Sequence, residues 1–156
     1  MIDDLRCFGL RKAVLGTRAL GCLVPRYRCN SSAVASHGLE DRLIHFGTAA
    51  CRLGESLPRS PLGMHVSLQL ARCSTSTFAN YGEVQSAESR RDFIHKLGIC
   101  LKELRETRTW LKFIRDMNLS DTESVAYLLR ECEELLAILA ASIRTARANA
   151  ARSNDQ

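Results

Sequence analysis

Apolar residues recur at steps of three and four along most of this chain, and polar residues fill the positions between them. From Leu39 to Leu57 the apolar positions alternate four and three residues apart, until Pro58 interrupts the pattern. This spacing is typical of an α-helix that buries one face. The pattern therefore predicts a first helix at about residues 39–57.

A second helix is expected at about residues 61–86. Ser60 can cap its first turn, and Pro61 suits the first helical position. The segment 74–80 is rich in Ser and Thr and has low helix propensity. We expect the helix to continue through it, because small side chains there would let neighbouring helices approach closely.

The longest uninterrupted helical spacing runs over residues 90–117, which predicts a third helix of about 40 Å. Ser89 and Asp92 form a capping box before it, and the helix is expected to stop at Asn118. Ser120 and Glu123 form a second capping box, which opens a leucine-rich helix at about residues 121–148. The fold expected is all-α, an antiparallel up-down-up-down four-helix bundle.

The bundle is expected to occupy residues 38–149, between a poorly ordered basic extension (1–37) and a disordered tail (150–156). The net charge of +5 comes mostly from residues 1–38, which contribute +4, so the bundle itself is nearly neutral. A transit-like or RNA-binding arm is the functional alternative for the extension. The apolar run Ala13–Val24 is not typical of a signal peptide, because Arg18 breaks it and Asp3 and Asp4 precede it where positive charge is expected. It is also too short and too charged to span a membrane, so we expect a cytoplasmic protein.

The chemistry-bearing residues do not assemble into an enzyme signature. The seven cysteines include no C-x-x-C pair, and those of the bundle fit small apolar core positions: Cys51, Cys73, Cys100 and Cys132. The histidines lack metal-ligand spacing, and the serines do not lie in a nucleophile elbow. The sequence also has no glycine-rich phosphate loop. We therefore expect a non-enzymatic protein with no cofactor and no metal.

At about 100° per residue, the third helix divides into three strips. One strip is the core face. A second apolar strip favours a subunit interface over a wide core and consists of Ile99, Trp110, Phe113 and Met117. The third strip is a basic arc that could follow nucleic-acid phosphates: Arg91, Lys102, Arg105 and Lys112. A solvated helix face, diluted by Glu103 and Glu106, is the alternative explanation of this basic arc.

Polar residues near the apolar face of the second helix need partners if they are buried. Asn80 and Glu83 lie there, and Lys96 or Arg72 could pair with Glu83. A structural polar network that fixes the register of the bundle is the interpretation we prefer to an acid/base pair.

The sequence resembles the four-helix-bundle family of 23S rRNA intervening-sequence proteins and the related accessory proteins of diversity-generating retroelements. The resemblance covers about residues 39–149. Its most specific positions are Arg72, Ser74, Ser76, Ala79-Asn80-Tyr81, Glu83, Ala87, Ser89, Asp92-Phe93, Lys96-Leu97, Lys102-Glu103-Leu104, Glu106-Thr107 and Trp110-Leu111. The chain departs from the family where smaller or different residues are usual, at Cys73, Phe78 and Gly82.

The resemblance implies a homopentameric ring that binds structured nucleic acid, and it supplies no catalytic residues. We therefore expect an oligomer that binds structured RNA or a nucleoprotein through the basic arc. The alternative is a scaffold that engages a partner enzyme, such as a reverse transcriptase, without touching nucleic acid.

Overall fold

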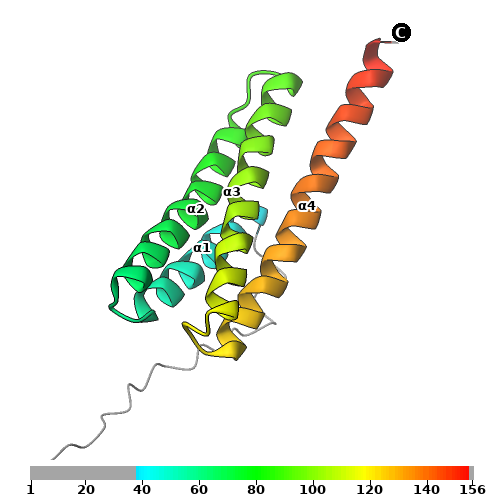
Figure 1. Ribbon diagram of the computed structural model, residues 1–156. Coiled ribbons are helices and arrows are strands. Elements are labelled where there is room, and N and C mark those ends of the chain that lie inside the picture. Colours follow the sequence, from blue (N-terminus) through cyan, green and yellow to red (C-terminus); the bar gives the residue numbers. More distant parts are fainter. Residues whose placement is uncertain (1–37, 155–156) are drawn as a thin grey trace, which may run out of the picture. The chain divides into compact units, whose positions relative to one another are not determined.

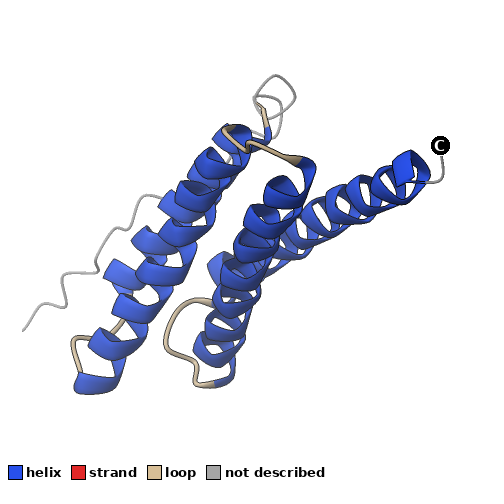
Figure 2. Ribbon diagram, turned by 90° about the horizontal axis from the view of Figure 1, so that it is seen from above, coloured by secondary structure: helices blue, strands red, loops and turns tan. Residues whose placement is uncertain are grey.

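The structure, a computed structural model, describes residues 38–154, with side chains to residue 150. These residues form α1 (Leu39–Ser56), α2 (Pro61–Gln85), α3 (Arg90–Asp116) and α4 (Thr122–Asn154). Figure 1 shows helices that run alternately up and down, and Figure 2 shows the short loops that join them. The predicted all-α four-helix bundle is confirmed. The predicted extension, residues 1–37, lies outside the described residues.

Two of the predicted caps begin their helices as expected. The Ser60 hydroxyl accepts a hydrogen bond from the Gly63 amide at 3.1 Å, and Pro61 follows at the first helical position. The Ser89 hydroxyl likewise accepts from the Asp92 amide at 3.1 Å. These bonds satisfy amides that lack a partner within the first turn of a helix.

The boundaries around the loop from α3 to α4 differ in detail from the prediction. Asn118 has φ of 50°, and the Leu119 amide donates to the Ile114 carbonyl, a left-handed helix end. The capping box predicted at Ser120 is wrong: Asp121 caps α4, because its carboxylate accepts from the Ser124 amide at 2.7 Å. At its other end α4 continues to Asn154, beyond the predicted end at residue 148.

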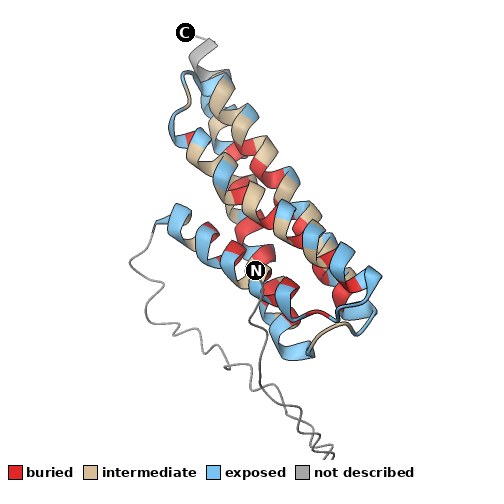
Figure 3. Cartoon of the chain, turned by 90° about the vertical axis from the view of Figure 1, so that its left-hand side faces the viewer, coloured by how far each residue is buried: buried red, intermediate tan, exposed pale blue. Residues whose placement is uncertain are grey.

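The core lies between the inward faces of the helices, as the red positions in Figure 3 show. α2 packs against α1 and α3, and α4 packs mainly against α3, with a smaller contact to α1. The apolar residues of α3 and α4 are buried along most of the shared length. Cys73, Cys100 and Cys132 are buried free thiols, as predicted, whereas Cys51 is half-buried.

The Ser/Thr-rich middle of α2 is helical because its hydroxyls bond to carbonyls of their own helix. Thr77 donates to the Cys73 carbonyl at 3.0 Å, and Ser74 donates to the Ala71 carbonyl at 3.2 Å. Both side chains are fully buried. Both hydroxyls are thus hydrogen-bonded within α2, and the Cys51 Sγ of α1 also lies 3.8 Å from the Ser74 Oγ.

Phe78, one of the departures from the family pattern, lies over a glycine of α1. A Cβ added at Gly47 would stand 2.8 Å from two carbons of the Phe78 ring. The absence of a side chain at Gly47 therefore makes room for the ring, and α1 and α2 stay close.

Candidate nucleic-acid interface

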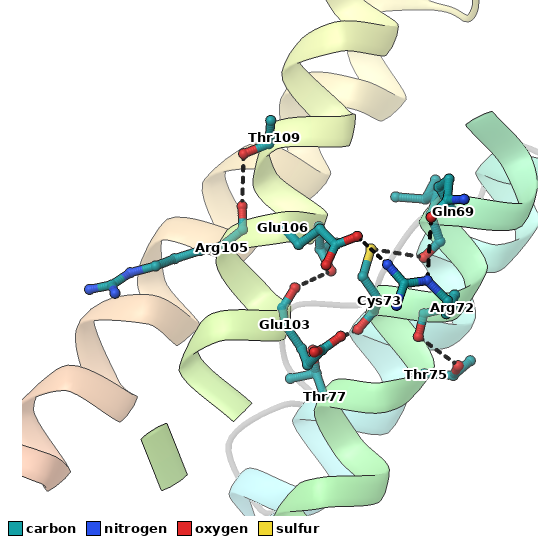
Figure 4. A network of polar contacts seen from close by, with 11 residues as sticks. Gln69, Arg72, Cys73, Thr75, Thr77, Glu103, Arg105, Glu106 and Thr109 are labelled. Carbon is teal, nitrogen blue, oxygen red and sulfur yellow. Dashed lines mark hydrogen bonds and ion pairs between the residues drawn. The ribbon is translucent and has the colours of Figure 1, made fainter. Parts of the chain in front are cut away.

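The basic arc predicted on α3 is exposed along the helix. Arg91, Lys102, Arg105 and Lys112 all lie at the surface. None of them makes an ion pair or side-chain hydrogen bond with another described residue. In Figure 4 the Arg105 side chain points away from the polar contacts between α2 and α3. At 1.5 Å per residue the arc extends over about 31 Å of the helix.

Many other cations of the described residues are held by carboxylates. Arg42 binds Glu131 through both oxygens, at 2.6 and 3.0 Å, and joins α1 to α4. Arg42 also pairs with Glu134. The other pairs lie between helices, one turn apart or between adjacent residues, and are Arg72–Glu106, Arg108–Glu133, Lys96–Asp92 and Arg115–Asp116. These cations therefore differ from those of the basic arc, because carboxylates neutralise their charges.

The acids that could dilute the basic arc are directed away from it. Glu106 is paired with Arg72 across the contact of α2 and α3, as Figure 4 shows. Glu103 has one carboxylate oxygen that is buried and has no hydrogen-bond partner among the described residues. The arc therefore keeps its positive charge despite these neighbours in sequence.

α4 carries three arginines that the sequence did not single out: Arg130, Arg144 and Arg147, all exposed and without an ion pair to a described residue. Arg108 of α3 contacts Glu133 of α4 at 3.3 Å, which shows which side of α4 borders α3. At about 100° per residue, Arg144 and Arg147 lie within about 20° and 40° of Glu133. The α3–α4 seam, defined as the exposed border between these helices, is therefore basic on both sides.

A signal for the α4 arginines exists in the sequence, because the acids of α4 all precede residue 135 and its arginines are concentrated after residue 143. The direction in which they point does not follow from that pattern. It depends on the rotation of α4 against α3, which the Arg108–Glu133 contact reveals.

The residues predicted for a subunit interface lie on the opposite shoulder of α3, toward α2. The Trp110 ring meets the His65 ring edge-on at 5.8 Å and the Phe113 ring at 6.0 Å. Ile99, Trp110 and Phe113 are half-buried, whereas Met117 is 48% exposed. Part of the aromatic surface is thus covered within the chain itself.

The outer side of α2 extends this apolar surface. Met64 is 55% exposed and Leu68 is 71% exposed, one turn apart and adjacent to His65. Large apolar side chains grouped at the surface are typical of protein contacts. We call this group, with Trp110, Phe113 and Met117, the α2–α3 apolar face.

The predicted polar network does not form as one unit among the described residues. Arg72 binds Glu106, and the Asn80 amide donates to the Ser76 carbonyl at 2.7 Å. Lys96 lies 2.8 Å from Asp92, whose hydrogen bond raises the pKa of Lys96, with a smaller effect from Glu83. Both residues expected to pair with Glu83 are thus bound to other carboxylates: Arg72 to Glu106 and Lys96 to Asp92.

The buried thiols are poor nucleophiles. Burial raises the pKa of Cys100 to about 11 and that of Cys132 to about 12. The Cys132 Sγ also donates to the Leu104 carbonyl at 3.5 Å. Within residues 38–154 no three His, Cys, Asp or Glu side chains are grouped so that they could hold a metal ion. None of the helices described is both long and apolar enough to cross a membrane.

Comparison with known proteins identifies the family. A sequence model of the 23S rRNA-intervening sequence protein family matches residues 42–141. A crystal structure of a protein of unknown function from the S23 ribosomal protein family of Bacteroides thetaiotaomicron is similar, with 30% identity and a TM-score of 0.64. The match covers 68% of this chain and 98% of that one. A comparison with curated proteins gives no match. The relation to accessory proteins of retroelements stays a prediction. The chain belongs to the 23S rRNA-intervening sequence protein family.

Proposed function

We propose that this protein is a non-enzymatic helical bundle that binds structured RNA, free or in a nucleoprotein, through the basic arc of α3. The observation that carries the proposal is the selective pairing of charges. Carboxylates hold the cations that join helices, whereas Arg91, Lys102, Arg105 and Lys112 keep their charges exposed. Exposed and unpaired cations in a row are suited to phosphate contacts.

The expected affinity is electrostatic and depends on salt. Each phosphate contact contributes about one counterion to the salt dependence of binding. An arc of this size would make a modest number of contacts per subunit. Assembly of several subunits would multiply a weak contact.

The test is a titration with a structured RNA at a low and a high salt concentration. Arg105→Glu combined with Lys112→Glu should weaken binding by at least about tenfold at low salt, since two contacts become repulsive. The matched control exchanges the two cations, Arg105→Lys with Lys112→Arg, and should bind nearly as wild type. An affinity that is absent at low salt, or unchanged by the charge reversal, would refute the proposal.

The α2–α3 apolar face supports a second part of the proposal, that the bundle is a homo-oligomer, with a pentamer as the state that the resemblance implies. Large apolar side chains exposed at the surface, here Met64, Leu68 and Met117, are unfavourable in a lone subunit. Light scattering should show an oligomer that Trp110→Ala weakens, with Ile44→Ala on α1 as the control. A monomeric wild type would refute it.

The same apolar face favours the second candidate function, a scaffold that engages a partner enzyme such as a reverse transcriptase. In that case the arc variants should leave partner binding intact while Leu68→Ala weakens it. The two candidates therefore respond to different variants.

A further inference from the structure

Gly98 stands inside α3, where another residue would stabilise the helix better. Glycine inside a helix is less favourable than alanine by about 1 kcal/mol. Packing explains the glycines at positions 47, 54 and 63, because a Cβ at Gly47, Gly54 or Gly63 would come within 3.1 Å of another atom. A Cβ at Gly98 would meet no atom within 4 Å, so packing among the described residues does not require glycine there.

The position of Gly98 is at the middle of the basic arc. At about 100° per residue it lies within about 20–40° of Arg91, Lys102 and Arg105, which flank it within two turns. Lys102 follows one turn later on the same side. At Gly98 no side chain covers the main chain of α3, and unpaired cations surround this point.

The arginines near the end of α4 lie toward the same part of α3. α4 runs antiparallel to α3, and its Cys132 is level with Leu104, since Sγ and the carbonyl oxygen are 3.5 Å apart. Arg144 and Arg147 follow about 18 and 22 Å farther along α4, beside the N-terminal half of α3 that carries Gly98. Leu139 and Ile143 remain buried, so α4 still packs on the bundle at this level.

Among the described residues, Tyr127 is the large aromatic side chain of α4 that is exposed, and at about 100° per residue it lies about 120° from Glu133, away from the α3–α4 seam. Trp110 and Phe113 lie on the α2 side of α3, where they pack against each other and His65. Proteins that hold single strands commonly stack bases on aromatic side chains, whereas double-helical RNA is bound by shape and backbone. Cations without stacking rings therefore favour a double helix.

We propose that the α3–α4 seam binds the sugar–phosphate backbone of double-helical RNA. The backbone approaches the main chain of α3 at Gly98. It is flanked there by Arg91, Lys102 and Arg105 of α3 on one side and by Arg144 and Arg147 of α4 on the other. The inference rests on the proposed function and deepens it. It adds α4 to the surface, names a duplex as the ligand and gives Gly98 a role in close approach.

The chain contains a matched control for Gly98. Gly82 also lies inside a helix, and a Cβ there meets no atom within 4 Å, but it belongs to α2, away from the seam. Glutamine is uncharged, long and a good helix former. Gly98→Gln and Gly82→Gln should therefore both raise the melting temperature, whereas only Gly98→Gln should obstruct the ligand.

Two probes are compared. One is a duplex RNA of about 16 base pairs, comparable to the length that a double-stranded RNA-binding domain spans. The other is one strand of that duplex alone. Wild type and Gly82→Gln should bind the duplex equally and more tightly than the single strand. Gly98→Gln should bind it about tenfold more weakly while melting at a higher temperature than wild type. A loss of affinity in a more stable protein cannot come from unfolding.

A charge reversal tests the α4 side. Arg147→Glu should weaken duplex binding and lower the salt slope by about one. Arg59→Glu, the same change at an exposed position in the loop before α2, should have little effect.

The outcomes separate this inference from the proposed function. If wild type binds neither RNA, the proposed function fails. If Arg105→Glu with Lys112→Glu weakens binding while Gly98→Gln and Arg147→Glu bind as wild type, the proposed function stands and this inference is overturned. Equal affinity for duplex and single strand also overturns it.

Discussion

Replacing Gly47 with alanine tests the close approach of α1 and α2. The added Cβ would lie 2.8 Å from Cδ1 and Cε1 of Phe78 and 3.2 Å from the Ser74 carbonyl oxygen. Carbon atoms pack favourably at about 3.5–4.0 Å, so the ring would have to move by about 0.7 Å. Overpacking of this kind costs about 1–3 kcal/mol, whereas alanine gains about 1 kcal/mol over glycine in a helix. We therefore expect Gly47→Ala to lower the free energy of unfolding by about 1 kcal/mol.

The same change should have the opposite sign when the ring is absent. Phe78→Ala removes the obstructing carbons and leaves only the 3.2 Å approach to the Ser74 carbonyl oxygen, so Gly47→Ala in that background should stabilise the protein by up to about 1 kcal/mol through helix propensity. The coupling between the two positions is then up to about 2 kcal/mol, well above the error of a double-mutant cycle.

Urea unfolding of the four proteins, followed by circular dichroism, measures the cycle. Gly82→Ala is the control, because its Cβ meets no atom within 4 Å and should stabilise both backgrounds alike. If Gly47→Ala stabilises the protein equally with and without the Phe78 ring, the packing described for α1 and α2 is wrong.

Two further predictions concern the α1–α4 contact and the thiols. Arg42→Met should lower the free energy of unfolding by about 1–2 kcal/mol, because Glu131, only 19% exposed, loses both hydrogen bonds. Adding Glu131→Gln should recover part of this loss, and urea unfolding that shows no recovery would contradict the pairing. At pH 8, alkylation mapped by mass spectrometry should modify Cys51 well before Cys100 and Cys132, whose pKa values of about 11 and about 12 leave less than about 0.1% thiolate. Equal labelling of the three in the folded protein would refute their burial.

The helices and their faces could be predicted from the sequence because burial of one face imposes a three-to-four spacing on apolar residues. The caps at Ser60 and Ser89 follow from residue type and from the apolar run behind them. Ser120 failed as a cap because Asp121 beside it can make the same bond, and only the backbone geometry selects between two adjacent candidates.

Contacts between helices could not be predicted in the same way, since periodicity fixes a face but not the register or rotation of its partner. Phe78 needs a glycine opposite it, and only the structure shows that Gly47 is at that level. Asn80 could have reached across to another helix, but its amide bonds to the Ser76 carbonyl instead. For the same reason the sequence does not show that Arg144 and Arg147 of α4 lie toward α3, although it shows that they are cations.

The near-neutral charge of the bundle does not argue against a nucleic-acid surface once the charges are placed. Electrostatic interactions between exposed charges fall off over about 8 Å at physiological ionic strength, so local arrangement outweighs the total. Carboxylates of the bundle bind Arg42, Arg72 and Arg108, and these pairs hold helices together. Such paired acids contribute little negative potential at the α3–α4 seam, because each is neutralised within hydrogen-bond distance. The cations left over on α3 and the end of α4 therefore act as a positive surface, and charge reversal there should change RNA affinity far more than reversal of an isolated cation elsewhere.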